Sequence, residues 1–287
     1  MNSHRPKPDL TLVNLIHHSL RADAARLAAT VTALDPSDQP GRLPAIRAFF
    51  DQYRGQLTMH HTHEDELFFP ALEARVGASR MHLSELDSQH EALDAAVHAA
   101  SDRLAILADP AGDFAADRAQ AVGALSAMAD LLDARLALEE QTALPLTESE
   151  MPAAHYKRLE IRARKQTPRP RAQFMIPWLI AHATPSQQQA LFRSAPPLRL
   201  FYWLNRRRYR HLDQALTPAA VPPVGEHQTW SSQSPRQKAL PAEGTLRCRR
   251  SCTRPPTPQN RSRPRSRTRR TGSRPSGRRS RPWAARS

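Results

Sequence analysis

The sequence predicts an all-α protein: an antiparallel up-down-up-down four-helix bundle with short C-terminal helices and a disordered basic tail. Four long segments between residues 10 and 146 repeat apolar residues at helical spacing, and none alternates like a strand. Short connections between them make consecutive helices antiparallel neighbours. Residues 217–287 are rich in Pro, Ser and Arg, a composition that buries too little apolar surface to fold.

Turn-forming residues set the limits of the four bundle helices. Asp35-Pro36 ends the first, because proline cannot continue a helix. Gly77 is the predicted C-terminal cap of the second. Asp109-Pro110 ends the third, and Pro145 is expected to close the fourth. The helices are therefore predicted over about residues 10–34, 44–76, 79–107 and 113–144.

Charge divides the chain into three parts. Lys and Arg number 12 against 23 Asp and Glu in residues 1–155, 13 against 2 in 156–216, and 17 against 2 in 217–287. We expect residues 1–150 to form the bundle, 151–216 a helical basic extension and 217–287 the tail. Two or three short helices are expected in the extension, with breaks at Pro177 and Pro185, either packed on the bundle or docked elsewhere.

Several classes of protein are disfavoured by the composition. No run approaches the roughly 20 apolar residues of a membrane span, and the N-terminal MNSHRPKPDL lacks the apolar run of a signal peptide. A cytoplasmic protein is therefore expected. Cys248 and Cys252 both lie in the tail, so they do not cross-link the bundle. No nucleophile triad or glycine-rich phosphate loop is recognisable, which favours a binding protein over an enzyme.

Histidines and carboxylates gather near one end of the predicted bundle. Ten of the 13 histidines lie within residues 1–155. Antiparallel helices bring the start of the first and third helices level with the end of the second and fourth. Imidazole and carboxylate together suit iron, manganese or zinc. The residues are His17 and His18 in the first helix, His60, His61, His63 and Glu64 in the second, His90 in the third, and Glu139 and Glu140 in the fourth.

Each of these residues also has an interpretation without a metal. A single core histidine such as His90 is more often hydrogen-bonded than metal-bound. Glu139 and Glu140 would then be solvated acids near a helix end. For His63 and Glu66 we prefer a place on a charged outer face. Histidine or a His/Glu pair on several helices at one level nevertheless favours a buried metal site, because unpaired buried charges are costly.

Four motifs together resemble the hemerythrin HHE cation-binding domains. HHTHEDELFFPAL at 60–72 is similar to the family signature HxxxE[ED]xxxFPxL, and it is the most specific of the four. HHSLRADAARL at 17–27, QHEALDA at 89–95 and LEEQTALPL at 138–146 resemble the family's other ligand-bearing helices. The segment 151–213 resembles the C-terminal extension of actinobacterial members. The resemblance covers about half of the chain.

This resemblance implies a carboxylate-bridged non-haem di-iron centre and a role in binding or sensing O2, NO or peroxide. The ligands it implies are His17, His60, Glu64, His90 and Glu139. Arg135 departs from the family, which normally has a histidine four residues before the glutamate that corresponds to Glu139. Arginine cannot ligate a metal. The second iron has therefore lost a ligand, and the centre is either mononuclear or an altered di-iron site.

Arg135 also supports an alternative in which no metal binds. Its guanidinium is expected to reach Glu64 and to act as a fixed cation where a metal would otherwise sit. The bundle would then be an interaction scaffold, with the basic tail binding nucleic acid or acidic partners through its charge. A tail produced by read-through, without a function of its own, is the equal alternative. Ferritin-like proteins are set aside because the sequence has no Glu-x-x-His.

Overall fold

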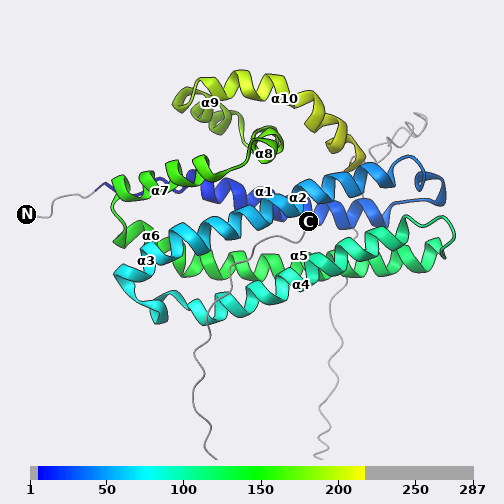
Figure 1. Cartoon of the computed structure of the whole chain (residues 1–287), viewed down its shortest axis with the longest axis horizontal. Coiled ribbons are helices and arrows are strands. Elements are labelled where there is room, and N and C mark those ends of the chain that lie inside the picture. Colours follow the sequence, from blue (N-terminus) through cyan, green and yellow to red (C-terminus); the bar gives the residue numbers. More distant parts are fainter. Residues whose placement is uncertain (1–5, 217–287) are drawn as a thin grey trace, which may run out of the picture. The chain divides into compact units, whose positions relative to one another are not determined.

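The computed structural model describes residues 6–216, and helices occupy nearly all of them, with no strand in this part of the chain (Figure 1). This confirms the predicted all-α class. Four long helices form the bundle, in which α4 packs along α5 and α5 along α1. No described helix has the length and apolar character needed to cross a membrane. The bundle helices are α1 (Thr11–Thr32), α2 (Leu43–His63), α4 (Leu83–Leu107) and α5 (Phe114–Gln141).

The second predicted helix contains a π-helical turn that the sequence pattern did not predict. The α2 helix runs directly into the turn η2 (Glu64–Phe68), and α3 (Phe69–Val76) follows. The N–H of Phe69 bonds to the carbonyl of Glu64, five residues back instead of four. Pro70 has no N–H to donate to the preceding turn, which favours this wider turn. Short 3-10 turns, η1 (Pro36–Asp38) and η3 (Ala78–Met81), lie in the next connections.

Pro145 does not close the fourth helical segment, so this part of the prediction was wrong. The α5 helix ends at Gln141, and a new helix, α6 (Ala143–Glu150), begins after Thr142. Proline lacks the N–H that would bond one turn back, so the break falls before Pro145 instead of after it. In the first turn of a new helix that N–H is not needed, and the chain therefore remains helical beyond the proline.

The extension forms four helices where two or three were expected. Pro185 begins a helix, as a break at that position requires, but Pro177 lies buried inside a helix without ending it. Packing against the bundle outweighs the hydrogen bond that Pro177 cannot make. The helices are α7 (Ala153–Gln166), α8 (Arg169–His182), α9 (Pro185–Ser194) and α10 (Pro197–Asp213), and the turn η4 (Gln214–Leu216) follows.

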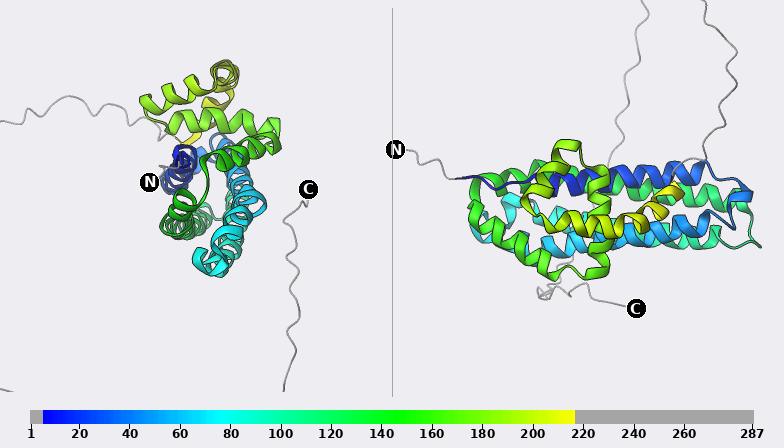
Figure 2. Two further views of the ribbon diagram at one scale, coloured as in Figure 1. Left: turned by 90° about the vertical axis from the view of Figure 1, so that its left-hand side faces the viewer. Right: turned by 90° about the horizontal axis from the view of Figure 1, so that it is seen from above.

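The extension packs on the bundle. The α8 helix contacts α1 and α2, and α10 contacts α8 and α2 (Figure 2). The tail at 217–287, predicted to be disordered and to bind nucleic acid or acidic partners, lies outside the described residues. Its role and the three-part division of the chain stay predictions.

A buried carboxylate on α1 anchors the extension. Asp23 is fully buried and accepts hydrogen bonds from Trp178 Nε1 at 2.7 Å, His182 Nε2 at 3.1 Å and Arg26 Nη1 at 2.6 Å. Arg26 also reaches Asp213 at the end of α10, at 2.8 Å. A buried carboxylate is costly unless several donors satisfy it, as they do here. The network therefore fixes both α8 and α10 to the first helix.

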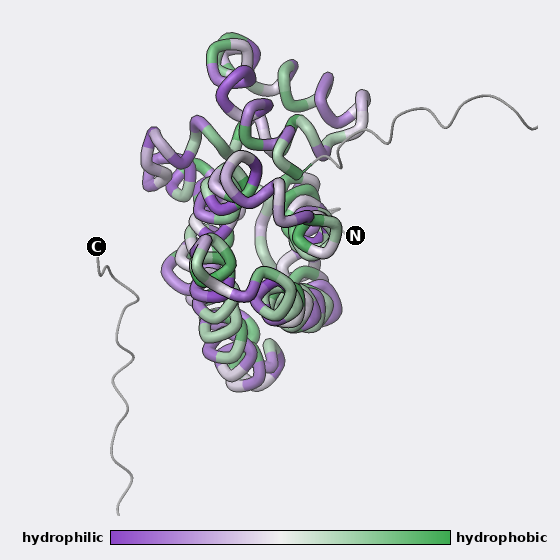
Figure 3. The backbone as a smooth tube through the Cα atoms, turned by 90° about the vertical axis from the view of Figure 1, so that its right-hand side faces the viewer, coloured by the Kyte–Doolittle hydropathy of each residue, from purple (hydrophilic) through white to green (hydrophobic). Residues whose placement is uncertain are grey.

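Two apolar clusters fill the interior, and a polar layer separates them. The larger cluster includes Leu20, Leu57, Leu93 and Leu136. The smaller cluster includes Leu67, Leu72, Leu86, Ala143 and Tyr156. The buried polar side chains at this boundary on α2, η2 and α5 are His60, His61, Glu64, Arg135 and Glu139. Figure 3, in which the bundle is seen end-on, shows hydrophobic and hydrophilic positions alternating along the helices.

Gly77 ends α3, as predicted, and its backbone offers a test of the fold. Its φ is +80° and its ψ is 151°, a combination that glycine alone adopts without strain. A Cβ at this position would meet nothing within 4 Å. Gly77→Ala is therefore expected to lower the free energy of unfolding by about 1–3 kcal/mol through the backbone alone.

Urea unfolding measures this change in free energy, and Gly123 supplies the matched control. It lies inside α5, and a Cβ there also meets nothing within 4 Å. Gly123→Ala is expected to raise the free energy of unfolding by about 0.5–1 kcal/mol. Equal effects of the two substitutions would contradict the conformation of Gly77.

Candidate metal centre

Four buried side chains from three helices and the π-turn converge in the polar layer. His17 comes from α1, His60 from α2, Glu64 from η2 and Glu139 from α5. One possible ligand atom of each lies within 4.8 Å of those of the other three. His60 and Glu64 are four residues apart, so both project from the same side of their helical segment. These are four of the five ligands that the sequence resemblance implies.

The two histidine nitrogens that face this cluster lack hydrogen-bond partners. His17 Nε2 lies 3.5 Å from Glu139 Oε2, and His60 Nε2 lies 3.2 Å from Glu64 Oε1. The carboxyl group of Glu139 also contacts the Arg135 guanidinium and the carboxyl group of Glu64. Neither of the two histidine nitrogens makes a hydrogen bond. Buried polar atoms are rarely left in this condition, because each costs the loss of its hydration. A cation placed beside the two histidine nitrogens would satisfy both of them.

His17 is oriented by a chain of charged groups outside the cluster. Its Nδ1 lies 2.9 Å from Glu140 Oε1, and Arg21 contacts both oxygens of that carboxylate, at 2.6 and 3.1 Å. Arg21 is itself held by Asp133 at 2.6 Å. Burial raises the pKa of Glu140, but hydrogen bonds from Arg21 and His17 outweigh it and hold this pKa below its ordinary value.

The charge state of Glu140 determines which nitrogen of His17 carries the proton. An ionised carboxylate only accepts hydrogen bonds, so Nδ1 of His17 must be the donor. The lone pair of Nε2 then faces the cluster. Carboxylate partners of this kind commonly orient histidines that bind metals.

Arg135 lies on the other side of the two cluster carboxylates and is fully buried. Its Nε is 3.0 Å from Glu139 Oε1, and its Nη2 is 3.5 Å from Glu64 Oε2. Nη1 donates a hydrogen bond of 2.7 Å to the carbonyl of Leu86 on α4. The guanidinium thus reaches Glu64 and spans both carboxylates, as the sequence suggested.

Burial sets the protonation of the cluster. It raises the pKa of Glu64 well above its ordinary value, with help from the charge of Glu139 and against the opposing charge of Arg135. The pKa of Glu139 is raised by burial too, against Arg135 and His17. Burial, followed by the neighbouring His17 and Arg135 side chains, holds the pKa of His60 well below its usual range. His60 is therefore neutral, the form that binds metals, and a cation placed beside the two carboxyl groups would favour their ionised form.

His90, the fifth implied ligand, lies apart from the four-residue cluster. Its ring is 4.5 Å from that of His61, and its Nδ1 is 3.5 Å from Asp65 Oδ2. His61 is buried, its Nε2 has no hydrogen-bond partner, and burial holds its pKa well below the usual range. His61 is among the histidines that the sequence places at this end of the bundle, but the family resemblance does not count it among the ligands. Its position four residues after the buried Leu57 was the signal that His61 would face the interior.

The helical segment that carries His60 and Glu64 has the charged outer face that the sequence predicted. Glu66 is exposed and His63 is partly exposed, as expected of an outer face.

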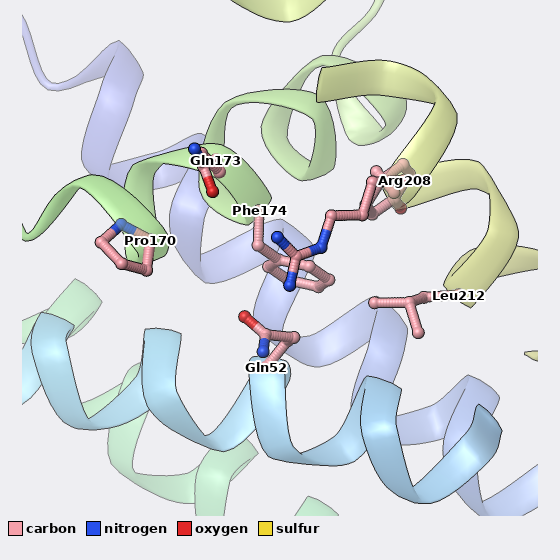
Figure 4. Close-up of a pocket in the computed structure, with 7 residues that line it drawn as sticks. Gln52, Pro170, Gln173, Phe174, Arg208 and Leu212 are labelled. Atoms are coloured by element: carbon pink, nitrogen blue, oxygen red, sulfur yellow. The ribbon is translucent and has the colours of Figure 1, made fainter. Parts of the chain in front are cut away.

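Two surface clefts lie away from the four-residue cluster. A small one of ≈ 50 Å³ lies between α2, α8 and α10, where Arg208 extends over Phe174 towards Gln52 (Figure 4). A second lies against α9. No cluster residue lines either cleft.

Comparison with known proteins agrees with this geometry. The model of the hemerythrin HHE cation-binding domain family matches residues 9–147, a segment that contains all four cluster residues. No curated protein and no solved structure matches the chain. Residues 9–147 therefore form a hemerythrin HHE cation-binding domain.

Proposed function

We propose that the domain binds a single non-haem iron ion through His17, His60, Glu64 and Glu139. The observation that carries this proposal is the convergence of four buried ligand atoms within 4.8 Å, of which the two histidine nitrogens have no hydrogen-bond partner. Two imidazoles and two carboxylates form a ligand set that suits iron and comparable divalent ions. The residues present therefore fit the cation that the family implies.

Arg135 is the reason to propose one ion instead of two. Its guanidinium lies within 3.5 Å of both cluster carboxylates and supplies a permanent positive charge beside them. A second cation that shared these carboxylates would be placed against this buried charge and repelled. His61 and His90 lie close to Arg135, whose charge helps to lower the pKa of both, and the guanidinium already pairs with both cluster carboxylates.

The physiological ligand we propose is a small molecule such as O2, NO or peroxide. Bound iron would supply redox chemistry and a coordination position open to such a ligand. The protein contributes the remaining selectivity. Glu140 and Arg21 fix the direction of His17, and the charge of Arg135 favours ligands that carry or develop negative charge.

Metal content is the direct test. Protein stripped by a chelator and reloaded with Fe(II) is expected to retain about one ion per chain and to unfold at a higher temperature, because the ion binds only the folded chain. His60→Ala is expected to abolish both effects. His98→Ala on the exposed face of α4 is the control and is expected to retain both.

The parent protein decides between the proposal and its alternative. If it retains no metal after reloading and its unfolding temperature does not change, the domain is a metal-free bundle. The ion pairs of Arg135 would then be the structural substitute for a metal.

Substitution of Glu140 tests the orientation of His17. Glu140→Gln keeps the size of the side chain but weakens its pairing with Arg21, so the amide no longer fixes the tautomer of His17. We expect the affinity for Fe(II) to fall by about 10–100-fold. Glu148→Gln, at an exposed carboxylate, is the control and should leave the affinity unchanged. A titration that shows equal affinities for both variants would exclude the role assigned to Glu140.

Arg135→His tests the limit of one ion. An imidazole removes the buried charge and adds a ligand, so elemental analysis is expected to find about two ions per chain. Arg135→Lys keeps the positive charge and is expected to stay at about one ion per chain. The proposed role of Arg135 is wrong if the histidine variant also holds a single ion while remaining folded by circular dichroism.

A further inference from the structure

The outward face of α10 carries an exposed apolar patch that the metal centre does not explain. Leu200, Trp203 and Leu204 are 64%, 57% and 62% exposed, more than any other large apolar side chain in the described part of the chain. Their spacing of three and four residues puts them on one side of the helix. We call these three residues the α10 patch. Contiguous exposed apolar groups of this kind indicate an interaction surface.

The patch is not needed to hold α10 in place. The inward face of the helix packs through Tyr209, whose ring lies 5.5 Å from that of Phe174, and through Tyr202, 5.8 Å from Phe192. Asp213 at its end pairs with Arg26. With these contacts made, the α10 patch faces away from the rest of the described chain.

Positive charge surrounds the α10 patch. Asp213, already paired, is the only acidic residue of the helix, whose sequence is PLRLFYWLNRRRYRHLD. Arg199, Arg207 and Arg210 are exposed, and the guanidinium of Arg206 lies 5.9 Å above the ring of Trp203. Arg199 also lines an open hollow of ≈ 520 Å³ between α9 and the start of α10. The surface thus combines apolar side chains with an arginine border.

We propose that the α10 patch inserts into the surface of an anionic lipid membrane, with α10 lying parallel to the bilayer. Helices that bind in this way carry Trp and Leu on one face and Lys or Arg beside them. Trp203 is suited to the headgroup level, and long arginine side chains keep their charge in water while their stems cover apolar surface. The arginines complement the negative surface potential of such a membrane.

The chemistry of the patch favours a membrane over nucleic acid. Binding to phosphates requires the arginines alone, and exposed leucines add nothing to it. Stacking on bases uses several aromatic side chains, whereas the patch has one. Insertion into the hydrocarbon of a membrane would bury Leu200, Trp203 and Leu204 together, and so explains why all three are exposed on this face.

The position of α10 leaves it accessible to a flat surface. The α9 and α10 helices form an outer layer on the side of the bundle opposite α4 (Figures 1 and 2). A bilayer can therefore meet the α10 patch without contacting the bundle. This inference is independent of the metal centre.

Vesicle binding of the full-length chain tests the proposal. The probe is vesicles of phosphatidylcholine with phosphatidylglycerol, compared with phosphatidylcholine alone, in sedimentation assays at about 0.1 M salt, where exposed charges are partly screened. L200S/W203S/L204S removes the patch and retains every charge, including those of residues 217–287. The matched control is L12S/I106S/I161S, which removes the other three exposed large apolar side chains.

Binding to the anionic vesicles is expected for the parent and the control, with at least a tenfold loss in the α10 patch variant. Neutral vesicles are expected to bind weakly. An α10 patch variant that binds like the parent, or a parent that does not bind anionic vesicles, would overturn the proposal. So would a patch variant that loses duplex DNA or RNA binding but keeps vesicle binding, since the surface would then belong to nucleic acid. Circular dichroism confirms that all variants are folded.

Discussion

The contact of the buried Arg135 guanidinium with Glu64 and Glu139 is the interaction on which this end of the bundle depends. Two carboxylates shielded from water repel each other, and each costs several kcal/mol to bury without compensation. The guanidinium lies against both of them and donates to the carbonyl of Leu86, so it also ties α5 to α4. This contact allows a charged layer to exist between two apolar clusters.

Helical spacing builds the rest of the layer around that contact. His60 with Glu64, and Arg135 with Glu139, are pairs four residues apart, so each pair projects from one side of its helical segment. His17 faces them from α1, with Glu140 and Arg21 behind it. The charged groups therefore extend from the surface inwards, and the Nε2 atoms of His17 and His60 remain without a hydrogen-bond partner.

Regular periodicity explains what the sequence could predict. The bundle helices follow from apolar residues at a spacing of 3.6, and the motifs at 17–27, 60–72 and 138–146 identified the four residues that converge. Features that depend on tertiary contacts were missed. Pro177 continues a helix because it is packed against the bundle, and His61 lies beside His90 because of the way α2 and α4 meet. Neither is visible in the local pattern of residue types.

The π-helical turn at Glu64–Phe68 fixes the length of the chain at this point. Each helical residue advances the chain by about 100°, so a turn with one extra residue rotates everything after it. The buried positions show this change, since Phe69 and Leu72 face the interior where an unbroken α2 would present Phe68 and Ala71. Loss of a single residue here would turn either Glu64 or the α3 core face away from the interior. Relatives that keep both the inward-facing Glu64 and the core face of α3 are therefore expected to differ by substitutions in this segment and not by insertions or deletions.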